Sequence, residues 1–362
     1  MAFKKNILVA PLDWGLGHST RCIPIIKLLN LHYSVIIAAE GAQRKLLEDE
    51  FPKLTFLPLR GYRARYSTQK RLLPLKILLQ LPGLFYRLYA EHIWLKKAVE
   101  MHHIDLVVSD NRFGLWHPTI PSIFITHQLQ IKGANKWVET LLRKVNYRYI
   151  NTFTQCWIPD FAGLPNLAGA LSHPVTMPRI PAVYLGALSR LIVHENIAQV
   201  YSLLIILSGP EPQRTLLENI LLKQIGKVQG SVLLVRGLPG EQQTIAAPGN
   251  VQVQNYLSAA ALQQAIASSS LVLSRAGYTT IMDLVKLNKR SILVPTPGQT
   301  EQEYLATHLQ QQGICISESQ QHFNLGNAMH RAESFVYTLP NYNMEEWSET
   351  VIKQVKLLLK EE

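Results

Sequence analysis

Continuous runs of Val, Ile and Leu recur along the chain and are separated by stretches with a helical pattern of apolar residues. In the first half these apolar runs lie at residues 6–11, 33–39, 54–59, 104–109 and 122–125. Helices are predicted at 23–29 and 42–50. Because the runs do not alternate with polar residues, they are typical of parallel strands covered on both faces. The first half is therefore predicted to be a doubly wound α/β domain.

The pattern begins again after a proline-rich connection at residues 173–190, which is expected to contain a short strand at 182–185. Further strands are predicted by apolar runs at 203–207, 231–235, 251–253, 271–273 and 291–294. A final amphipathic helix is indicated by apolar residues three or four positions apart, namely Met344, Trp347, Val351, Val355 and Leu358.

This order predicts an α/β protein with two Rossmann-like, doubly wound domains that face each other across a cleft. We expect an N-terminal domain over residues 1–186 and a C-terminal domain over residues 187–340. The last helix, within residues 341–362, is expected to pack on the N-terminal domain.

Composition narrows the class of protein. The chain has 362 residues, a net charge of +11, 47% apolar residues and 17% charged residues, which favours a folded protein with an anionic partner. Cys22, Cys156 and Cys315 are far apart, so neither a disulfide scaffold nor a zinc ribbon is expected. The sequence has no run of about 18 apolar residues, so no membrane-spanning helix is expected. The first residues are predicted to form a strand and not a signal peptide. The usage of the three distant cysteines suits a reducing cytoplasm.

The first candidate site is a glycine-rich turn, Asp13-Trp14-Gly15-Leu16-Gly17-His18, directly after the first strand. Glycines at such a turn let backbone N–H groups approach an anion. A histidine there lies where ligands bind in this fold, so His18 is a candidate base. The bland alternative is a tight turn in which Ser19 or Thr20 caps the helix.

The same turn leaves a dinucleotide interpretation open. Gly15 and Gly17 match part of the GxGxxG pattern, and Glu40 after the second strand could bind a ribose. Position 20 is Thr and not Gly, so the match is partial.

The second candidate is the turn Ser208-Gly209-Pro210-Glu211-Pro212, which again follows a strand and opens a helix. Ser208 and Gly209 could donate to a phosphate. The alternative is a stiff proline turn without a ligand.

The third candidate follows the strand at 271–273. Small residues and hydroxyls at the start of a helix could hold a diphosphate, and they are Ala276, Gly277, Thr279 and Thr280. Asp283 lies one turn further on, where it could accept from ribose hydroxyls. The alternative is a capping box formed by Thr280 and Asp283.

The fourth candidate, residues 295–303, follows the next strand and precedes a helix. Glu301 and Gln302 would lie in its first turn, and an acid beside an amide suits the hydroxyls of a hexose. Thr300 and Glu303 form another plausible capping box.

The order SRAGYTTIMDL and then ILVPTPGQTEQEYLA resembles the C-terminal half of GT-B glycosyltransferases, and most of all the MurG-like glycosyltransferase family 28. The turn GLGH is similar to the N-terminal glycine-rich loop of that group. The best match covers roughly residues 270–310. The resemblance implies an inverting transfer from a UDP-sugar, with no metal and no other cofactor, and a donor held by the C-terminal domain.

The family's motifs imply roles for individual residues. Its ribose-binding acid, often Glu, falls on Asp283, and its second phosphate loop falls on Ser208 and Gly209, where the prolines remove donors. The resemblance implies phosphate contacts from Ala276, Gly277, Thr279 and Thr280, and sugar contacts from Gln299, Glu301 and Gln302.

The same comparison places the family's loop histidine on His18. His18 is then the candidate base, and Asp13 or Asp110 could orient or replace it. Gly15, Gly17 and His127 are candidates on the acceptor side. Arg275, if it points inward, would stabilise the charge on departing UDP together with helix N-termini at Gly209 and Thr280.

Residues 60–97 are basic and rich in apolar residues, with only Glu91 as an acid. This pattern suits contact with anionic lipid head groups at the inner face of the cytoplasmic membrane, as for a lipid-linked or cell-envelope acceptor. An ordinary helix packed on the domain is the alternative. No nucleic-acid module supports nucleic-acid binding.

The expected function is therefore the transfer of a hexosyl group, with N-acetylglucosaminyl as one candidate, from a UDP-sugar to an acceptor hydroxyl. A nucleotide-sugar hydrolase or epimerase on the same scaffold is the alternative among enzymes. A non-catalytic binder of nucleotide sugars or nucleic acid is the alternative outside enzymes.

Overall fold

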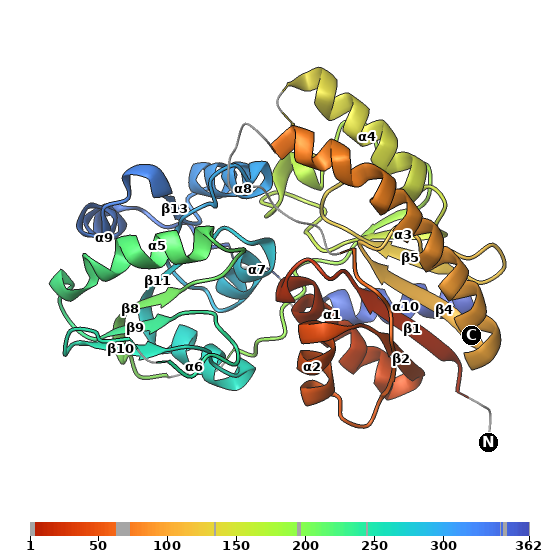
Figure 1. The fold of residues 1–362 in the computed structure, drawn as a ribbon, viewed down its shortest axis with the longest axis horizontal. Coiled ribbons are helices and arrows are strands. Elements are labelled where there is room, and N and C mark those ends of the chain that lie inside the picture. Colours follow the sequence, from red (N-terminus) through yellow and green to blue (C-terminus); the bar gives the residue numbers. More distant parts are fainter. Residues whose placement is uncertain are drawn as a thin grey trace. The chain divides into compact units, whose positions relative to one another are not determined.

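The computed structural model describes residues 4–62, 73–133, 135–193, 197–243, 245–340, 342 and 346–361, with the side chains of 73–82 left out. The chain divides into two compact units (Figure 1). Unit 1 contains Met1–Arg190 and Asn343–Glu362, and unit 2 contains Leu191–Tyr342.

Unit 1 contains a sheet of seven described strands, all parallel, in the order β3-β2-β1-β4-β5-β6-β7. The strands are β1 (Asn6–Pro11), β2 (Ser34–Ala38), β3 (Thr55–Leu57), β4 (Ile104–Asp110), β5 (Ser122–Ile125), β6 (Gln155–Ile158) and β7 (Ala182–Tyr184). The strand order reverses between β1 and β4, so their carboxyl ends form the switch point where ligands bind in such sheets.

The described helices of unit 1 cover both faces of this sheet. They are α1 (Leu16–His32), α2 (Gly41–Glu50), α3 (Leu73–His102), α4 (Lys136–Ile150), the short 3-10 helix η2 (Gly169–Leu171) and α10 (Glu346–Leu359). One core contains Leu8 and Ala10 of β1 together with Leu95 and Ala98 of α3. The alternate β1 residues point to the opposite face, where α1 lies.

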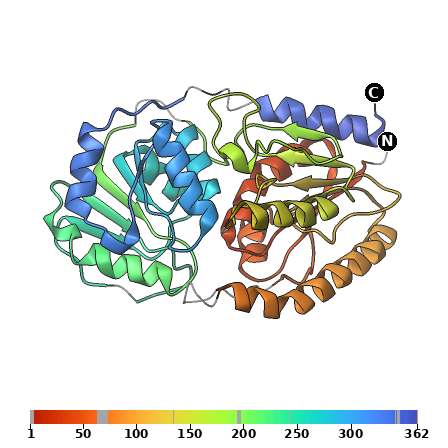
Figure 2. The same cartoon turned by 90° about the horizontal axis from the view of Figure 1, so that it is seen from above.

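The C-terminal helix α10 belongs to unit 1. It lies against α1, and Figure 2 shows α10 and α3 on opposite sides of the sheet. Tyr33 donates from its hydroxyl to Glu361 Oε2 over 2.8 Å, and Gln155 donates to Gln354 Oε1 over 2.7 Å. Buried Trp347, Val351 and Val355 form the apolar side of the helix.

Unit 2 contains a sheet of six described strands, again all parallel, in the order β10-β9-β8-β11-β12-β13. The strands are β8 (Tyr201–Ile206), β9 (Val232–Val235), β10 (Val251–Gln254), β11 (Ser269–Ser274), β12 (Ser291–Leu293) and β13 (Ile316–Ser317). The order reverses between β8 and β11, which is the switch point of this unit.

The described helices of unit 2 are α5 (Gln213–Leu222), η3 (Ile225–Lys227), α6 (Ala259–Ala267), α7 (Tyr278–Lys286), α8 (Thr300–Gln311), η4 (Gln320–His322) and α9 (Leu325–Ser334). Helices α5 and α9 share one core with the strands, to which Leu217, Leu221, Leu325 and Ala328 contribute. Helix α6 contacts β8 and β11 outside that core.

The two parallel α/β domains expected from the apolar runs are confirmed. Strands β6 and β13 were not predicted, because a run such as QCWI is short and opens with a polar residue. Helix α1 begins at Leu16, seven residues before the predicted start, with Gly15 as its N-cap at φ +82°. The alternative in which Ser19 or Thr20 caps the helix is therefore wrong.

Candidate active site

A buried ion pair lies at the switch point of unit 1. Asp110, at the end of β4, is fully buried, and Arg21 of α1 donates to it from Nε over 3.1 Å and 3.0 Å and also from Nη2. His18, one turn earlier on α1, places Nδ1 3.0 Å from Asp110 Oδ2. The predicted candidates His18 and Asp110 thus come together, and Arg21 is a partner that the sequence pattern did not indicate.

The charges of this cluster are set by its members. Burial alone would raise the pKa of Asp110, but the Arg21 guanidinium, helped by His18, lowers it to about 2. Burial, together with the positive charge of Arg21, lowers the pKa of His18 below its usual 6.5, although Asp110 acts in the opposite direction. At neutral pH the cluster therefore holds an ionised carboxylate beside a neutral imidazole.

The imidazole of His18 has two neighbours on the same nitrogen. Nδ1 lies 2.8 Å from Arg21 Nη2 and 3.0 Å from Asp110 Oδ2. When Nδ1 carries the proton, it donates to Asp110 and leaves Nε2 with a lone pair, as a base requires. Its side chain is 18% exposed, so the ring reaches solvent while Asp110 does not.

Two further side chains complete the cluster. His127, after β5, is buried and has Nδ1 3.3 Å from Arg21 Nη1. Cys22 Sγ lies 3.7 Å from Asp110 Oδ2. Burial, and then the charge of Asp110, raises the pKa of Cys22 well above 9.0, so the thiol stays protonated at neutral pH.

The glycine-rich turn before α1 is held by hydrogen bonds to its backbone. Gln43 of α2 donates to the carbonyls of Leu12 and Gly15, the latter over 3.0 Å. Asp13 Oδ1 accepts from the N–H of Tyr62 over 2.8 Å, so the structure places this carboxylate on the segment at 61–62.

The two remaining candidates near this turn also have structural partners. Glu40, the ribose acid of the dinucleotide interpretation, accepts from the N–H of Gly61 over 2.8 Å. Gly17 lies within the first turn of α1, where its carbonyl accepts from the Thr20 hydroxyl over 2.9 Å.

The turn after β4 sends neighbouring side chains in different directions. Asn111 adopts the left-handed conformation at φ +54°. Asp110 before it reaches Arg21, while Arg112 after it forms a buried ion pair with Glu91 of α3. Tyr62 donates its hydroxyl to the same Glu91 over 2.5 Å. These bonds attach α3 to the sheet next to the His18 cluster.

In unit 2, the predicted donor residues gather at the carboxyl ends of β11 and β12, which are neighbouring strands. Helix α7 begins at Tyr278 with Gly277 as N-cap, and no described side chain caps it. Thr280 therefore lies in the first turn, and the capping box with Asp283 is not formed. Ala276, for which a phosphate contact was expected, is fully buried.

The loop from β12 into α8 is braced by the first turn of that helix. Gln302 Oε1 accepts from the N–H of Thr296 over 2.9 Å, and Glu303 Oε1 accepts from the N–H of Gly298 over 2.8 Å. The N-cap is Gln299, so the capping box expected for Thr300 and Glu303 is wrong by one residue at the cap. Glu301 and Gln299 lie at the same helix start, both partly exposed.

Arg275 is directed into unit 2. It is 1% exposed and donates to the carbonyls of Val294 (3.2 Å), Pro295 (3.4 Å) and Gln213 (2.7 Å). Burial lowers its pKa to about 10, so it stays charged at neutral pH. Arg275 thus joins the loops after β8 and β12, which is a different contact from the phosphate contact expected for it.

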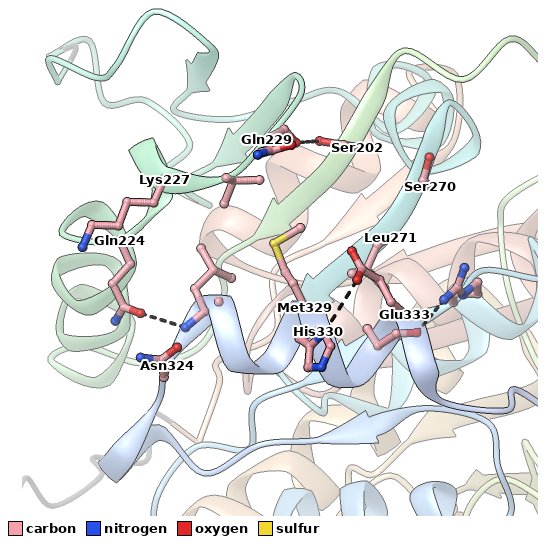
Figure 3. Close-up of a pocket in the computed structure, with 15 residues that line it drawn as sticks. Ser202, Gln224, Lys227, Gln229, Ser270, Leu271, Asn324, Met329, His330 and Glu333 are labelled. Atoms are coloured by element: carbon pink, nitrogen blue, oxygen red, sulfur yellow. Dashed lines mark hydrogen bonds and ion pairs between the residues drawn. The ribbon is translucent and has the colours of Figure 1, made fainter.

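Among the described residues of unit 2, a hollow of about 590 Å³ is lined by residues at the amino ends of β8 and β11 and by α9 (Figure 3). Its polar groups largely bond to the protein, as Ser202 does to Gln229, and none of the predicted donor residues lines it. A smaller hollow of about 280 Å³, missed by sequence reasoning, lies after β9 and β10 and is lined by Glu241, Asn255 and Tyr256 among others.

Helix α3 presents apolar residues on two faces. Its buried or partly buried side packs on unit 1 through Leu84, Leu88, Leu95 and Ala98. Its exposed side includes Phe85, Tyr86 and Tyr89, and α4 exposes a stripe of Trp137, Leu141 and Val145. The basic residues Arg63, Arg65, Lys70 and Arg71 of the predicted membrane-contact segment lie outside the described residues.

Among the described residues, no helix is both long enough and apolar enough to cross a membrane. No group of three or more His, Cys, Asp or Glu residues in the described part of the chain is placed to hold a metal ion.

Comparison with known proteins adds family evidence for unit 2. Residues 213–352 match the model of the glycosyltransferase family 28 C-terminal domain. Over 81 residues the chain is 38% identical to the UDP-N-acetylglucosamine--N-acetylmuramyl-(pentapeptide) pyrophosphoryl-undecaprenol N-acetylglucosamine transferase of Desulforudis audaxviator (strain MP104C). That match spans 22% of this chain and about a fifth (21%) of the relative's length.

Solved structures match over the whole chain. The glycosyltransferase SnogD from Streptomyces nogalater has a TM-score of 0.64 at 14% identity, covering 99% of this chain and 100% of that one. MurG from Acinetobacter baumannii has a TM-score of 0.53 at 13% identity and covers 99% of both chains. At such identity the likeness shows the fold. The whole chain therefore has the two-domain α/β fold of these glycosyltransferase structures, and residues 213–352 are similar to the glycosyltransferase family 28 C-terminal domain.

Proposed function

We propose that the protein transfers a hexosyl group from a UDP-sugar to an acceptor hydroxyl, with inversion and without a metal ion. The observation that carries the proposal is the His18–Asp110–Arg21 cluster, which keeps a neutral imidazole beside a fixed carboxylate at the switch point of unit 1. This is the arrangement that deprotonating a hydroxyl near neutral pH requires. The match of residues 213–352 to the family 28 C-terminal domain supports a nucleotide-sugar donor.

In this proposal His18 is the base. With its Nδ1–H donated to Asp110, Nε2 takes the proton of the acceptor hydroxyl as that oxygen attacks the anomeric carbon. The bond from the anomeric carbon to the diphosphate breaks, and UDP leaves with the electron pair. Asp110 then stabilises the imidazolium, and Arg21 holds the carboxylate in place for this contact.

The donor is assigned to the carboxyl edge of unit 2. Backbone N–H groups and hydroxyls of Gly277, Thr279 and Thr280 would bind the diphosphate at the uncapped start of α7. Asp283 would accept from the ribose hydroxyls. The sugar would meet Gln299, Glu301 and the free amide end of Gln302. The smaller hollow beside Tyr256 would accept the uracil ring of the donor.

A lipid-linked acceptor is proposed from the exposed surface of unit 1. The α3 aromatics Phe85, Tyr86 and Tyr89 and the α4 stripe that includes Trp137 are exposed, and the exposed Lys96 and Lys97 lie on the same helix as the aromatics. Aromatic and basic side chains together suit the interface of an anionic membrane. The named substrate of the Desulforudis relative, a pyrophosphoryl-undecaprenol, is of this class.

The function is tested by stabilisation and turnover with a panel of UDP-, dTDP-, GDP- and ADP-sugars and of NADH. We expect a UDP-sugar to raise the melting temperature most, and UDP to appear only when an acceptor is present. UDP release from the donor alone would instead indicate a hydrolase, and stabilisation by NADH would favour the dinucleotide interpretation.

The surface is tested by sedimentation with vesicles. Wild-type protein should bind vesicles that contain anionic phospholipid more than zwitterionic vesicles, and the pair Tyr86→Ser and Tyr89→Ser should weaken that binding. Leu216→Ser, an exposed leucine of unit 2, is the matched control. Equal binding by the double variant would exclude these aromatics as the contact.

A further inference from the structure

The loop after β12 contains Thr296, whose backbone is hydrogen-bonded but whose buried hydroxyl is not. The N–H of Thr296 donates to Gln302 Oε1 and its carbonyl accepts from the N–H of Gln299 over 3.0 Å. Its side chain is 2% exposed, yet among the described residues Oγ1 has no hydrogen-bond partner. A buried hydroxyl without a partner costs folding free energy, and Val would fill the same space without that cost. The hydroxyl therefore indicates a ligand at this point.

The hydroxyl faces the turn after β8. A Cβ placed on Gly209 would have Thr296 Oγ1 as its only described neighbour within 4 Å, at 3.9 Å. Gly209 itself has φ +99°, a conformation that favours glycine. The space above Gly209 is thus open towards Thr296, and both residues lie at the carboxyl edge of the sheet.

This turn is poor in donors for an anion. Pro210 and Pro212 have no N–H. The N–H groups of Gln213 and Arg214 donate to the carbonyl of Pro210 over 3.1 Å and 3.3 Å. The N–H of Thr215 donates to Glu211 Oε2 over 3.2 Å. The start of α5 is therefore satisfied by its own chain, and a phosphate at this turn needs a donor from another loop.

We propose that Thr296 Oγ1 donates a hydrogen bond to an oxygen of the β-phosphate of the nucleoside diphosphate, beside the N–H groups of Ser208 and Gly209. The assignment rests on the proposed donor site of unit 2. Thr296 supplies the donor that the two prolines withhold from the turn. The one nearby acid of the turn, Glu211, is compensated by Arg214, whose Nε donates to it over 2.5 Å.

The test is calorimetric binding of UDP, UMP and uridine to wild type, Thr296→Val and Thr296→Ser. We expect Thr296→Val to weaken UDP about tenfold or more, because a hydrogen bond to a charged phosphate is lost. UMP and uridine should bind as before, and Thr296→Ser should keep the affinity for UDP. Without ligand, Thr296→Val should melt at or above the wild-type temperature. Thr307→Val is the matched control, since that exposed hydroxyl bonds to the carbonyl of Glu303 within α8.

Three results would overturn the assignment. Unchanged UDP affinity in Thr296→Val would remove the hydroxyl from the phosphate, while the donor site itself would stand. Equal weakening of uridine and UDP would show a structural role. Absence of binding by wild type to UDP, dTDP, GDP, ADP and pyrophosphate would reject the proposed function together with this inference. If Thr296→Val does not fold, Thr296→Ala and Thr296→Ser replace it in the test. The assignment then requires that Thr296→Ala loses affinity for UDP and that Thr296→Ser keeps it.

Discussion

Both sheets are parallel, so in each of them the strands end at one common edge. The residues at these two carboxyl edges differ in their chemistry. In unit 1 the edge is built from charges, with Asp110 ionised against Arg21 and His18 beside them. In unit 2 the part of the edge assigned to the diphosphate offers a helix start without a side-chain cap at Gly277 and a neutral hydroxyl at Thr296. A site that moves a proton needs groups held in fixed protonation states, whereas a site that binds an anion can rely on backbone N–H groups and hydroxyls.

The largest expected effect is a loss of stability when the ion pair at the carboxyl edge of unit 1 is removed. Arg21→Met removes the partner of a fully buried carboxylate, so the free energy of unfolding at pH 7 should fall by about 3–5 kcal/mol. Because Arg21 lowers the pKa of Asp110 from 3.8 to about 2, its stabilisation is complete above pH 3.8 and is lost as the pH falls towards 2. The deficit of the variant should therefore shrink below pH 4. Urea unfolding at several pH values measures both effects.

The matched control for Arg21→Met is Arg44→Met. Arg44 pairs with Glu48 on α2, where the two side chains are 37% and 43% exposed. Exposed pairs of this kind contribute about 0.3–0.5 kcal/mol, so the control should change little. A similar loss in both variants would contradict the view that Asp110 depends on Arg21.

The next effect concerns turnover and leaves donor binding intact. His18→Ala should lower kcat by about 10²–10⁴, because the acceptor hydroxyl loses its base. The affinity for the UDP-sugar should not change, since the donor is assigned to unit 2. Steady-state kinetics and calorimetry measure the two, with the exposed His32 of the same helix replaced by Ala as control. Loss of donor affinity in the His18 variant would place this histidine on the donor.

The sequence pattern predicted the fold well, because most of the described strands are buried on both faces. A run such as NILVAP is typical of an interior strand of a parallel sheet, and the structure has β1 at those residues. The two-residue strand β13 and the strand QCWI carry too few apolar positions to be recognised. The early start of α1 was missed because Gly17 and Thr20 disfavour a helix while packing on the sheet favours it.

The site could be predicted only as far as the chain order of motifs allowed. His18 and Asp110 each follow a strand, and the two strands are neighbours, so their meeting follows from the topology. Arg21 gave no signal because an arginine inside an apolar helix usually lies on the surface. Thr296 gave none either, since only the folded chain shows that its hydroxyl lacks a partner among the described residues.

A smaller effect is expected at the carboxyl edge of unit 2. Asp283→Ala should weaken UDP by about 1–3 kcal/mol, through loss of a hydrogen bond to the ribose. The same variant should bind a 2′,3′-dideoxy analogue of UDP no worse than wild type does, because that ligand lacks the hydroxyls. Calorimetry with both ligands gives the coupling free energy between Asp283 and the ribose hydroxyls. Unchanged UDP affinity would remove Asp283 from the ribose.

The smallest effect, a displaced pH midpoint, separates the two edges most directly. Burial and Arg21 lower the pKa of His18 below 6.5, so kcat should reach half its plateau at a pH below 6.5 and rise from there as the base loses its proton. At pH 6 the enzyme should keep more than the roughly one quarter of maximal rate that an unperturbed imidazole would give. Asp283→Ala should leave this midpoint in place, because its side chain belongs to the donor edge. A midpoint above 6.5 in wild type would contradict the role of Arg21 beside His18. A shifted midpoint in the Asp283 variant would show that a residue assigned to donor binding also affects proton transfer.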